Sequence, residues 1–206
     1  MEPELNVLSF RVSTGQFGYV HTLSTATEWD AWLVMVIPNV LDANVRSRRR
    51  SNLKHILVGV EKKAGLITPH ATRGAGNASV LFEPYYTVMI FEFCVGAFSV
   101  CEGLGTAFRL RDVGNNGANA PRIARDHWIA SLVGVADPNG NLDLEAKVRG
   151  IKSVRDKMHQ DRLGARQEID WRAFSYDDAF LPAKSAILAL LQIDPHHVPA
   201  ATNLTA

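Results

Sequence analysis

Apolar and polar positions follow a helical period along most of the chain after residue 24. Within each stretch, hydrophobic residues recur three and four positions apart, which is typical of helices that bury one face. Ser24 or Thr25 can cap the first helix, because Glu28 stands three positions beyond Thr25. An apolar helix follows through Ile37, and Pro38 either kinks or ends it. The later stretches predict helices at about 39–64, 84–111, 121–136, 142–162 and 176–192.

Breaks between these stretches divide the chain into parts. Residues 65–83 are rich in Gly, Pro and small polar residues and predict a long loop, so residues 1–83 form an N-terminal helical extension. Residues 84–193 are expected to form a helical bundle, and residues 194–206 a disordered tail. Only residues 5–20 hint at a short strand segment. The predicted fold class is all-α, a helical bundle with an N-terminal extension.

Composition agrees with a folded, soluble protein. Of 206 residues, 47% are hydrophobic and 21% charged, and the net charge of +1 gives no bulk attraction to nucleic acid. Cys94 and Cys101 lie two helical turns apart, roughly 10 Å, which is too far for a disulfide. We therefore expect buried free thiols in a reducing, cytoplasmic compartment. Trp29 and Trp32, three positions apart, are expected in the core.

The most apolar window is long enough to raise the question of a membrane span. It reads YYTVMIFEFCVGAFSVCEGLG and contains the two carboxylates Glu92 and Glu102. Charged residues are costly inside a bilayer, so a central helix of a soluble bundle is the better interpretation. The N-terminal MEPELNVLSF is acidic and lacks the apolar core of a signal peptide. We expect no membrane association.

A basic run lies in the second predicted helix. Five cations fall within nine residues: Arg46, Arg48, Arg49, Arg50 and Lys54. Such a run spreads around most of a helix and is often only a solvated face. The alternative is contact with RNA phosphates, because clustered arginines neutralise a phosphate backbone without a high net charge.

A second candidate site lies near the end of the helix predicted at 142–162. Arg155 and His159 are four positions apart, so they share one helix face with Cβ atoms roughly 5–6 Å apart. A guanidinium can hold a phosphate with two hydrogen bonds, and an imidazole can move a proton near neutral pH. These two functions can cleave RNA without a metal. Asp156 could orient the pair; two solvated side chains are the plain alternative.

The surroundings of this pair resemble the HEPN superfamily of helical bundles over about residues 84–193. In that family an Arg, followed by a polar residue, precedes a His near the end of one helix. Arg155, Asp156 and His159 match that motif in VRDKMHQD. An acidic residue of an earlier helix often faces the motif, and Glu102 in FSVCEGLG is the match here. The last helix is matched by YDDAFLPAKSAILALL.

The resemblance implies a metal-independent ribonuclease or an RNA-binding protein, in a defence or toxin-like setting with a neutralising partner protein. Two chains would form a homodimer in which both Arg155–His159 motifs face one cleft. It implies no cofactor, and no metal site is expected in the sequence. Three residues separate Arg155 from His159, whereas the family usually has four to six. The alternative is a non-catalytic bundle that binds a nucleotide or serves as a protein-interaction scaffold.

Overall fold

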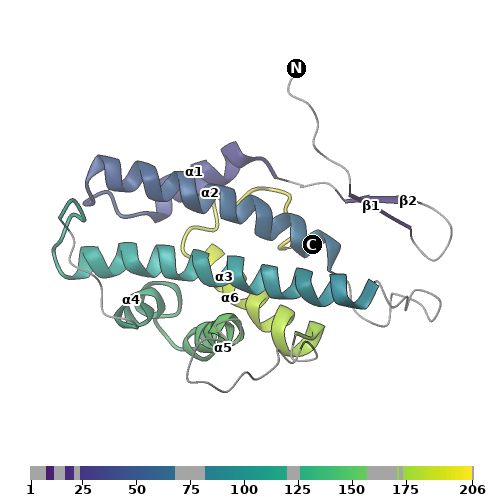
Figure 1. Cartoon of the computed structure of the whole chain (residues 1–206). Coiled ribbons are helices and arrows are strands. Elements are labelled where there is room, and N and C mark those ends of the chain that lie inside the picture. The colour runs from purple at the N-terminus through teal and green to yellow at the C-terminus, as the bar shows by residue number, and fades with distance from the viewer. Residues whose placement is uncertain are drawn as a thin grey trace.

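The protein is an all-α helical bundle, as predicted (Figure 1). The structure is a computed structural model that describes residues 8–11, 17–20, 24–67, 82–119, 126–156, 171 and 174–205. Its helices are α1 (Ala26–Val36), α2 (Ala43–Leu66), α3 (Phe82–Asp112), α4 (His127–Ala136), α5 (Leu144–Asp156) and α6 (Leu181–Leu191). A π-helical turn, η3 (Tyr176–Phe180), leads directly into α6. The strands β1 (Leu8–Arg11) and β2 (Phe17–Val20) form an antiparallel hairpin within the segment that hinted at strands.

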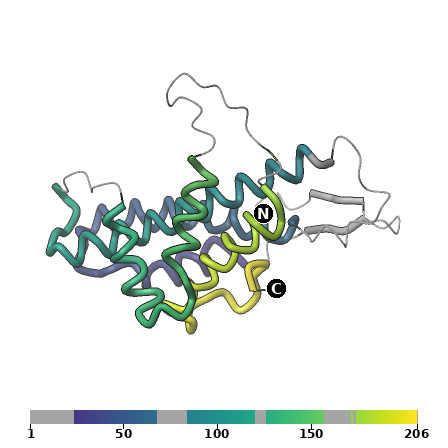
Figure 2. Tube along the Cα trace, turned by 90° about the horizontal axis from the view of Figure 1, so that it is seen from below, coloured from purple at the N-terminus to yellow at the C-terminus, as the bar shows by residue number. Residues whose placement is uncertain are grey.

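Helix α3 is the central element of the bundle. It packs against α2 on one side and against α4, α5 and α6 on the other, and α1 covers α2 (Figures 1 and 2). Glycines allow the close contacts. A Cβ atom at Gly96 would lie 2.6 Å from Val60 of α2, and one at Gly105 would lie 2.5 Å from the ring of Trp128 of α4. These positions therefore accept no side chain while the helices stay in place.

The apolar character of α3 is explained by its place in the core. By length and composition alone Pro84–Asp112 could cross a membrane, since its mean hydropathy is 1.6. In the bundle its residues Phe93, Cys94 and Leu104 are fully buried between the surrounding helices. Burial in a protein core and burial in lipid select the same residues, and the neighbouring helices bury 56% of this apolar window.

Helix starts follow the capping residues. Thr25 and Glu28 form the predicted capping box at α1: Glu28 N donates to Thr25 Oγ1 at 3.2 Å, and Thr25 N donates to Glu28 Oε2 at 2.8 Å. The predicted start of α2 at residue 39 is too early. Asp42 caps that helix, because its Oδ1 accepts from Asn44 N at 2.9 Å.

The expected disordered tail is wrong for residues 194–205. Leu204 is fully buried and Thr202 is 1% exposed. The backbone N of Asn203 donates to Glu61 of α2 at 3.4 Å, so the end of the chain returns to the second helix. The tail has no helical period, and its order comes from packing Leu204 and Val198 against the core. Local sequence cannot reveal such long-range contacts.

Candidate functional site

Arg155 lies in the last turn of α5 and packs on α3. Its guanidinium carbon is 4.5 Å from the centroid of the Phe98 ring, within the range of a cation–π interaction. Phe98 is buried and also contacts Trp128 of α4 edge to face, with ring centroids 5.7 Å apart. The Arg155 side chain is 28% exposed. The contact therefore holds a partly accessible cation against the middle of the central helix.

Asp156 is the ionic partner of Arg155. Nε and Nη2 of Arg155 donate to Asp156 Oδ1 at 3.1 and 2.8 Å. These bonds use two of the five N–H donors of a guanidinium and leave the others for a ligand. The sequence suggested that Asp156 could orient Arg155 and His159. Asp156 contacts Arg155, and its role in orienting the pair stays a prediction.

Glu102 lies on α3 close to Phe98, the residue that Arg155 contacts. It follows Phe98 by four residues, so it lies on nearly the same side of the helix one turn further on. Its side chain is exposed, and in the described part of the chain it forms no ion pair with Arg155. An exposed carboxylate is accessible to a ligand or to a second chain.

His159 lies outside the described residues, because the description of α5 ends at Asp156. The predicted proximity of Arg155 and His159 therefore stays a prediction. The described half of the motif consists of Arg155 and Asp156, with Glu102 nearby on α3.

Three cations of the basic run have partners within the protein. Arg50 Nε donates to Asp30 Oδ1 of α1 at 3.3 Å, and Lys54 Nζ lies 4.0 Å from the same oxygen. The hydrogen bond from Arg50 is the main reason that the pKa of Asp30 is lowered. Arg49 Nη1 donates to the backbone oxygen of Gly103 at 3.0 Å, and burial lowers the pKa of this guanidinium. These three side chains therefore join α2 to α1 and α3.

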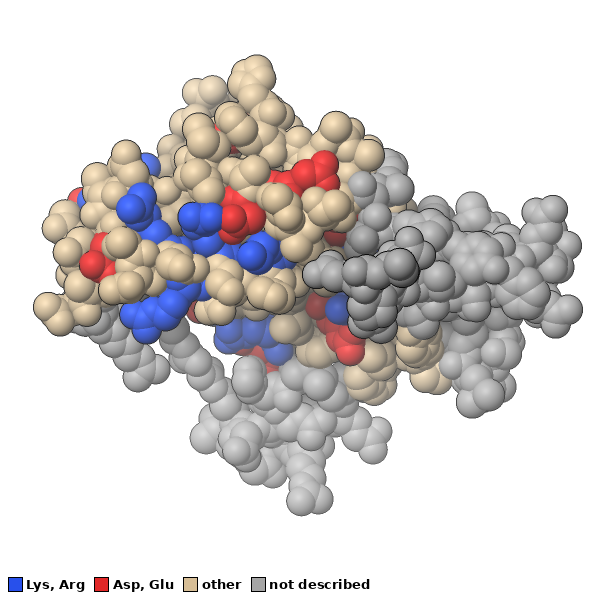
Figure 3. Space-filling view, turned by 90° about the horizontal axis from the view of Figure 1, so that it is seen from above, with Lys and Arg blue, Asp and Glu red and all other residues tan. Residues whose placement is uncertain are grey.

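The other two cations of the run, Arg46 and Arg48, form weaker hydrogen bonds or leave a nitrogen unpaired. Arg48 is exposed, and its Nε donates to Asn44 O at the long distance of 3.5 Å. Arg46 is half-buried, with Nε unpaired. On the face formed by α1 and α2, basic side chains alternate with acidic ones (Figure 3). RNA contact by the run stays a prediction, and Arg48 is the member best placed for it.

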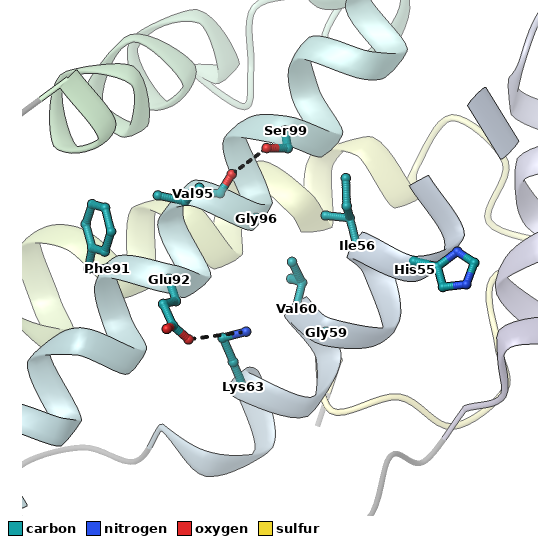
Figure 4. A pocket seen from close by; sticks show the side chains of 10 residues that line it. All are labelled: His55, Ile56, Gly59, Val60, Lys63, Phe91, Glu92, Val95, Gly96 and Ser99. Carbon is teal, nitrogen blue, oxygen red and sulfur yellow. Dashed lines mark hydrogen bonds and ion pairs between the residues drawn. The ribbon is translucent and has the colours of Figure 1, made fainter. Parts of the chain in front are cut away.

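A groove that the sequence does not predict lies between α2 and α3 (Figure 4). Its volume is about 480 Å³. Helix α2 contributes one wall and α3 the other, and no single stretch of sequence contains both halves. The lining residues are His55, Ile56, Gly59, Val60, Lys63, Phe91, Glu92, Val95, Gly96 and Ser99.

Two classes of chemistry have no site in the described part of the chain. No three His, Cys, Asp or Glu side chains come together there in a way that could hold a metal ion. Cys94 and Cys101 are free and buried, as predicted, and burial raises the pKa of each thiol to about 12. A thiol with such a pKa is almost entirely protonated at neutral pH and is a poor nucleophile.

Comparisons with protein-family models, curated proteins and solved structures found no match for this chain. The functional interpretation therefore depends on the site geometry and on the sequence resemblance.

Proposed function

We propose that this protein is a HEPN-like RNA-binding protein and metal-independent ribonuclease whose site is built on Arg155, His159 and Glu102. The contact between Arg155 and Phe98 carries the proposal. It keeps a partly exposed guanidinium at the junction of α5 and α3, one helical turn from the exposed Glu102. A phosphate-binding side chain needs such a fixed position, because a freely moving cation would lose conformational entropy on binding.

The proposed reaction is cleavage by the 2′-hydroxyl of RNA. His159 takes the proton from this hydroxyl, and the resulting oxygen attacks the neighbouring phosphorus. The bond from phosphorus to the 5′-oxygen breaks, and that oxygen receives a proton from a protonated imidazole. The products are a 2′,3′-cyclic phosphate and a free 5′-hydroxyl. Arg155 stabilises the charge that develops on the phosphoryl oxygens, and Glu102 positions a partner group.

The first test is cleavage by the wild-type protein in the presence of a chelator. We expect single-stranded RNA to be cut at the same rate with and without EDTA, because side chains perform every step of the proposed reaction. The measurement is the rate of product formation on a gel with varied RNA substrates. Loss of activity in EDTA, restored by a divalent cation, would contradict the metal-independent mechanism.

The proposal also expects a homodimer, in which two Arg155–His159 motifs share one cleft. Symmetric twofold pairing is the commonest oligomeric arrangement. Light scattering at tens of micromolar should therefore give about twice the 22.7 kDa mass of one chain. A mass of one chain at that concentration would exclude the shared cleft while leaving RNA binding by single chains open.

One observation favours the non-catalytic alternative. Asp156 already neutralises Arg155, and the stack on Phe98 gives this arginine a role in packing. A scaffold that binds a nucleotide or a protein would use Arg155 in this structural way and would need no His159 chemistry. The two functions differ in whether RNA is cut.

A further inference from the structure

Trp171 differs from the other tryptophans of the protein in its exposure. The chain has four tryptophans, and Trp29, Trp32 and Trp128 are at most 3% exposed, whereas Trp171 is 39% exposed. An indole that stays in contact with water forgoes the hydrophobic stabilisation of burial. Tryptophan and arginine are enriched among the residues that dominate binding energies. An exposed tryptophan close to an arginine is therefore a candidate for binding.

Two phenylalanines hold Trp171 in place. Its ring centroid lies 6.5 Å from that of Phe91 on α3 and 5.4 Å from that of Phe174, with the ring planes inclined at 83° and 65°. Phe174 is 1% exposed, and its ring centroid lies 5.3 Å from that of Phe91. All three contacts are edge to face, so no aromatic ring among the described residues stacks in parallel on the indole. The indole is fixed in position, while parallel stacking stays available to a ligand.

Trp171 and Arg155 lie along one side of α3. Their contacts on this helix are Phe91 and Phe98, which are seven positions apart, 98 minus 91, and therefore point to nearly the same side. The two contacts are separated by roughly 10 Å along the helix axis. The ring of Phe91 points away from the groove between α2 and α3 (Figure 4). A positioned cation and an exposed indole therefore border the same side of the central helix.

This arrangement combines two contacts that single-stranded nucleic acid uses. Arg155 keeps guanidinium donors free beside Asp156 and is 28% exposed, so it can bind a phosphate. An indole stacks on a base, and such stacking tolerates every base because each one has a π-face. A small apolar ligand would use the indole alone, and an inorganic anion would use the arginine alone. A strand of nucleotides uses both.

We propose that Trp171 is a base-stacking platform for single-stranded RNA, which holds one base while Arg155 holds a phosphate of the same strand. This inference rests on the proposed function and adds a binding residue outside the Arg155–His159 motif. Trp171 takes no part in proton transfer and positions the strand through its base. Duplex RNA is a poor occupant, because its bases are stacked on one another inside the helix.

The intrinsic fluorescence of the wild-type protein tests the platform directly, because Trp171 is the exposed tryptophan and the other three are buried. The probe is a 2′-O-methyl RNA oligomer of mixed sequence, which lacks the attacking hydroxyl and is bound without being cut. A base stacked on the indole quenches its emission and shields it from acrylamide, and we expect both effects. An abasic oligomer of the same length has the phosphates but no base, so it should leave both measurements nearly unchanged.

Binding of the same oligomer with a fluorescent label, measured by anisotropy at several salt concentrations, separates stacking from charge. Trp171→Ala should weaken binding by roughly tenfold or more, the usual loss of one base–aromatic stack, and leave the salt slope unchanged. Trp171→Phe keeps an aromatic face and should retain most of the affinity. Arg155→Ala should instead reduce the salt slope by about one, because it removes a phosphate contact.

Met35→Ala is the matched control, because Met35 is a large apolar side chain that is 55% exposed on α1, the helix that covers α2. Its affinity and salt slope should equal those of the wild type. If the wild type binds the oligomer but its fluorescence is unchanged, or Trp171→Ala binds as tightly, the platform is wrong and the proposed function stands without it. The platform is also wrong if the dimer shields Trp171 from acrylamide without RNA, since a second copy then covers the indole. If the wild type binds no single-stranded RNA, the platform and the proposed function both fail.

Discussion

Glu61→Leu is expected to lower the free energy of unfolding by about 3–5 kcal/mol, in the range for breaking a buried charged network. Glu61 is fully buried, and its carboxylate accepts from Ser24 N at 3.0 Å, Trp29 Nε1 at 2.9 Å and Asn203 N at 3.4 Å. Ser24 Oγ also donates to it. Leucine fills similar space but leaves these donors without an acceptor, which destabilises the fold wherever a donor is buried.

Urea unfolding and the melting temperature measure this effect. Glu61→Gln should cost less than Glu61→Leu, because the amide oxygen keeps one acceptor. Glu145→Leu is the control: Glu145 is exposed on α5, and among the described residues its one ion-pair partner is Arg149, so its loss should change stability by less than about 0.5 kcal/mol. If Glu61→Leu unfolds at the wild-type urea concentration, this carboxylate does not hold α1 and the C-terminal tail to α2.

The helices could be predicted because their signals are local. The apolar period and Pro84 predicted a helix at 84–111, and α3 spans Phe82–Asp112. Thr25 and Glu28 predict the start of α1, because their capping box lies within four residues. Trp29 and Trp32 were expected in the core, and both are fully buried. These features depend on neighbours along the chain, which sequence displays directly.

The Glu61 network could not be predicted, because its members are far apart in sequence. Ser24 is 37 residues from Glu61, Trp29 is 32 residues away and Asn203 is 142 residues away. A glutamate in the middle of a helix normally indicates a solvated face. Only the packing of α1 and the tail on α2 makes this carboxylate the acceptor for several buried donors.

The candidate site was predictable in part for the same reason. The pairing of Arg155 with Asp156 joins neighbours, whereas the stack on Phe98 joins α5 to α3 across 57 positions, 155 minus 98. The sequence near Arg155 does not predict that Phe98 is its aromatic partner. The groove follows the same rule, since Lys63 meets Glu92, and Val60 meets Gly96, only when α2 packs on α3.

His159→Ala is expected to lower the rate of RNA cleavage by at least about a hundredfold, the usual contribution of general acid–base catalysis. Arg155→Ala should reduce cleavage and also weaken RNA binding, because a phosphate-binding guanidinium acts in the ground state and the transition state alike. Arg155→Ala should cost about 0.5–1 kcal/mol of stability through the lost contact with Phe98. Single-turnover cleavage, RNA binding and thermal unfolding separate these effects.

Arg149→Ala provides the matched control for charge. Arg149 lies on the same helix, is 53% exposed and pairs with Glu145 at 2.7 Å, so its removal changes the net charge of the protein as Arg155→Ala does. It should cleave RNA at nearly the wild-type rate. A loss of activity in Arg149→Ala equal to that in Arg155→Ala would mean that general electrostatic attraction, not a positioned guanidinium, supports cleavage.

If wild type cuts none of the RNAs tried, or His159→Ala cuts as fast as wild type, the catalytic proposal is wrong. Arg155 then belongs to a binding scaffold, in which its contacts with Phe98 and Asp156 are its function.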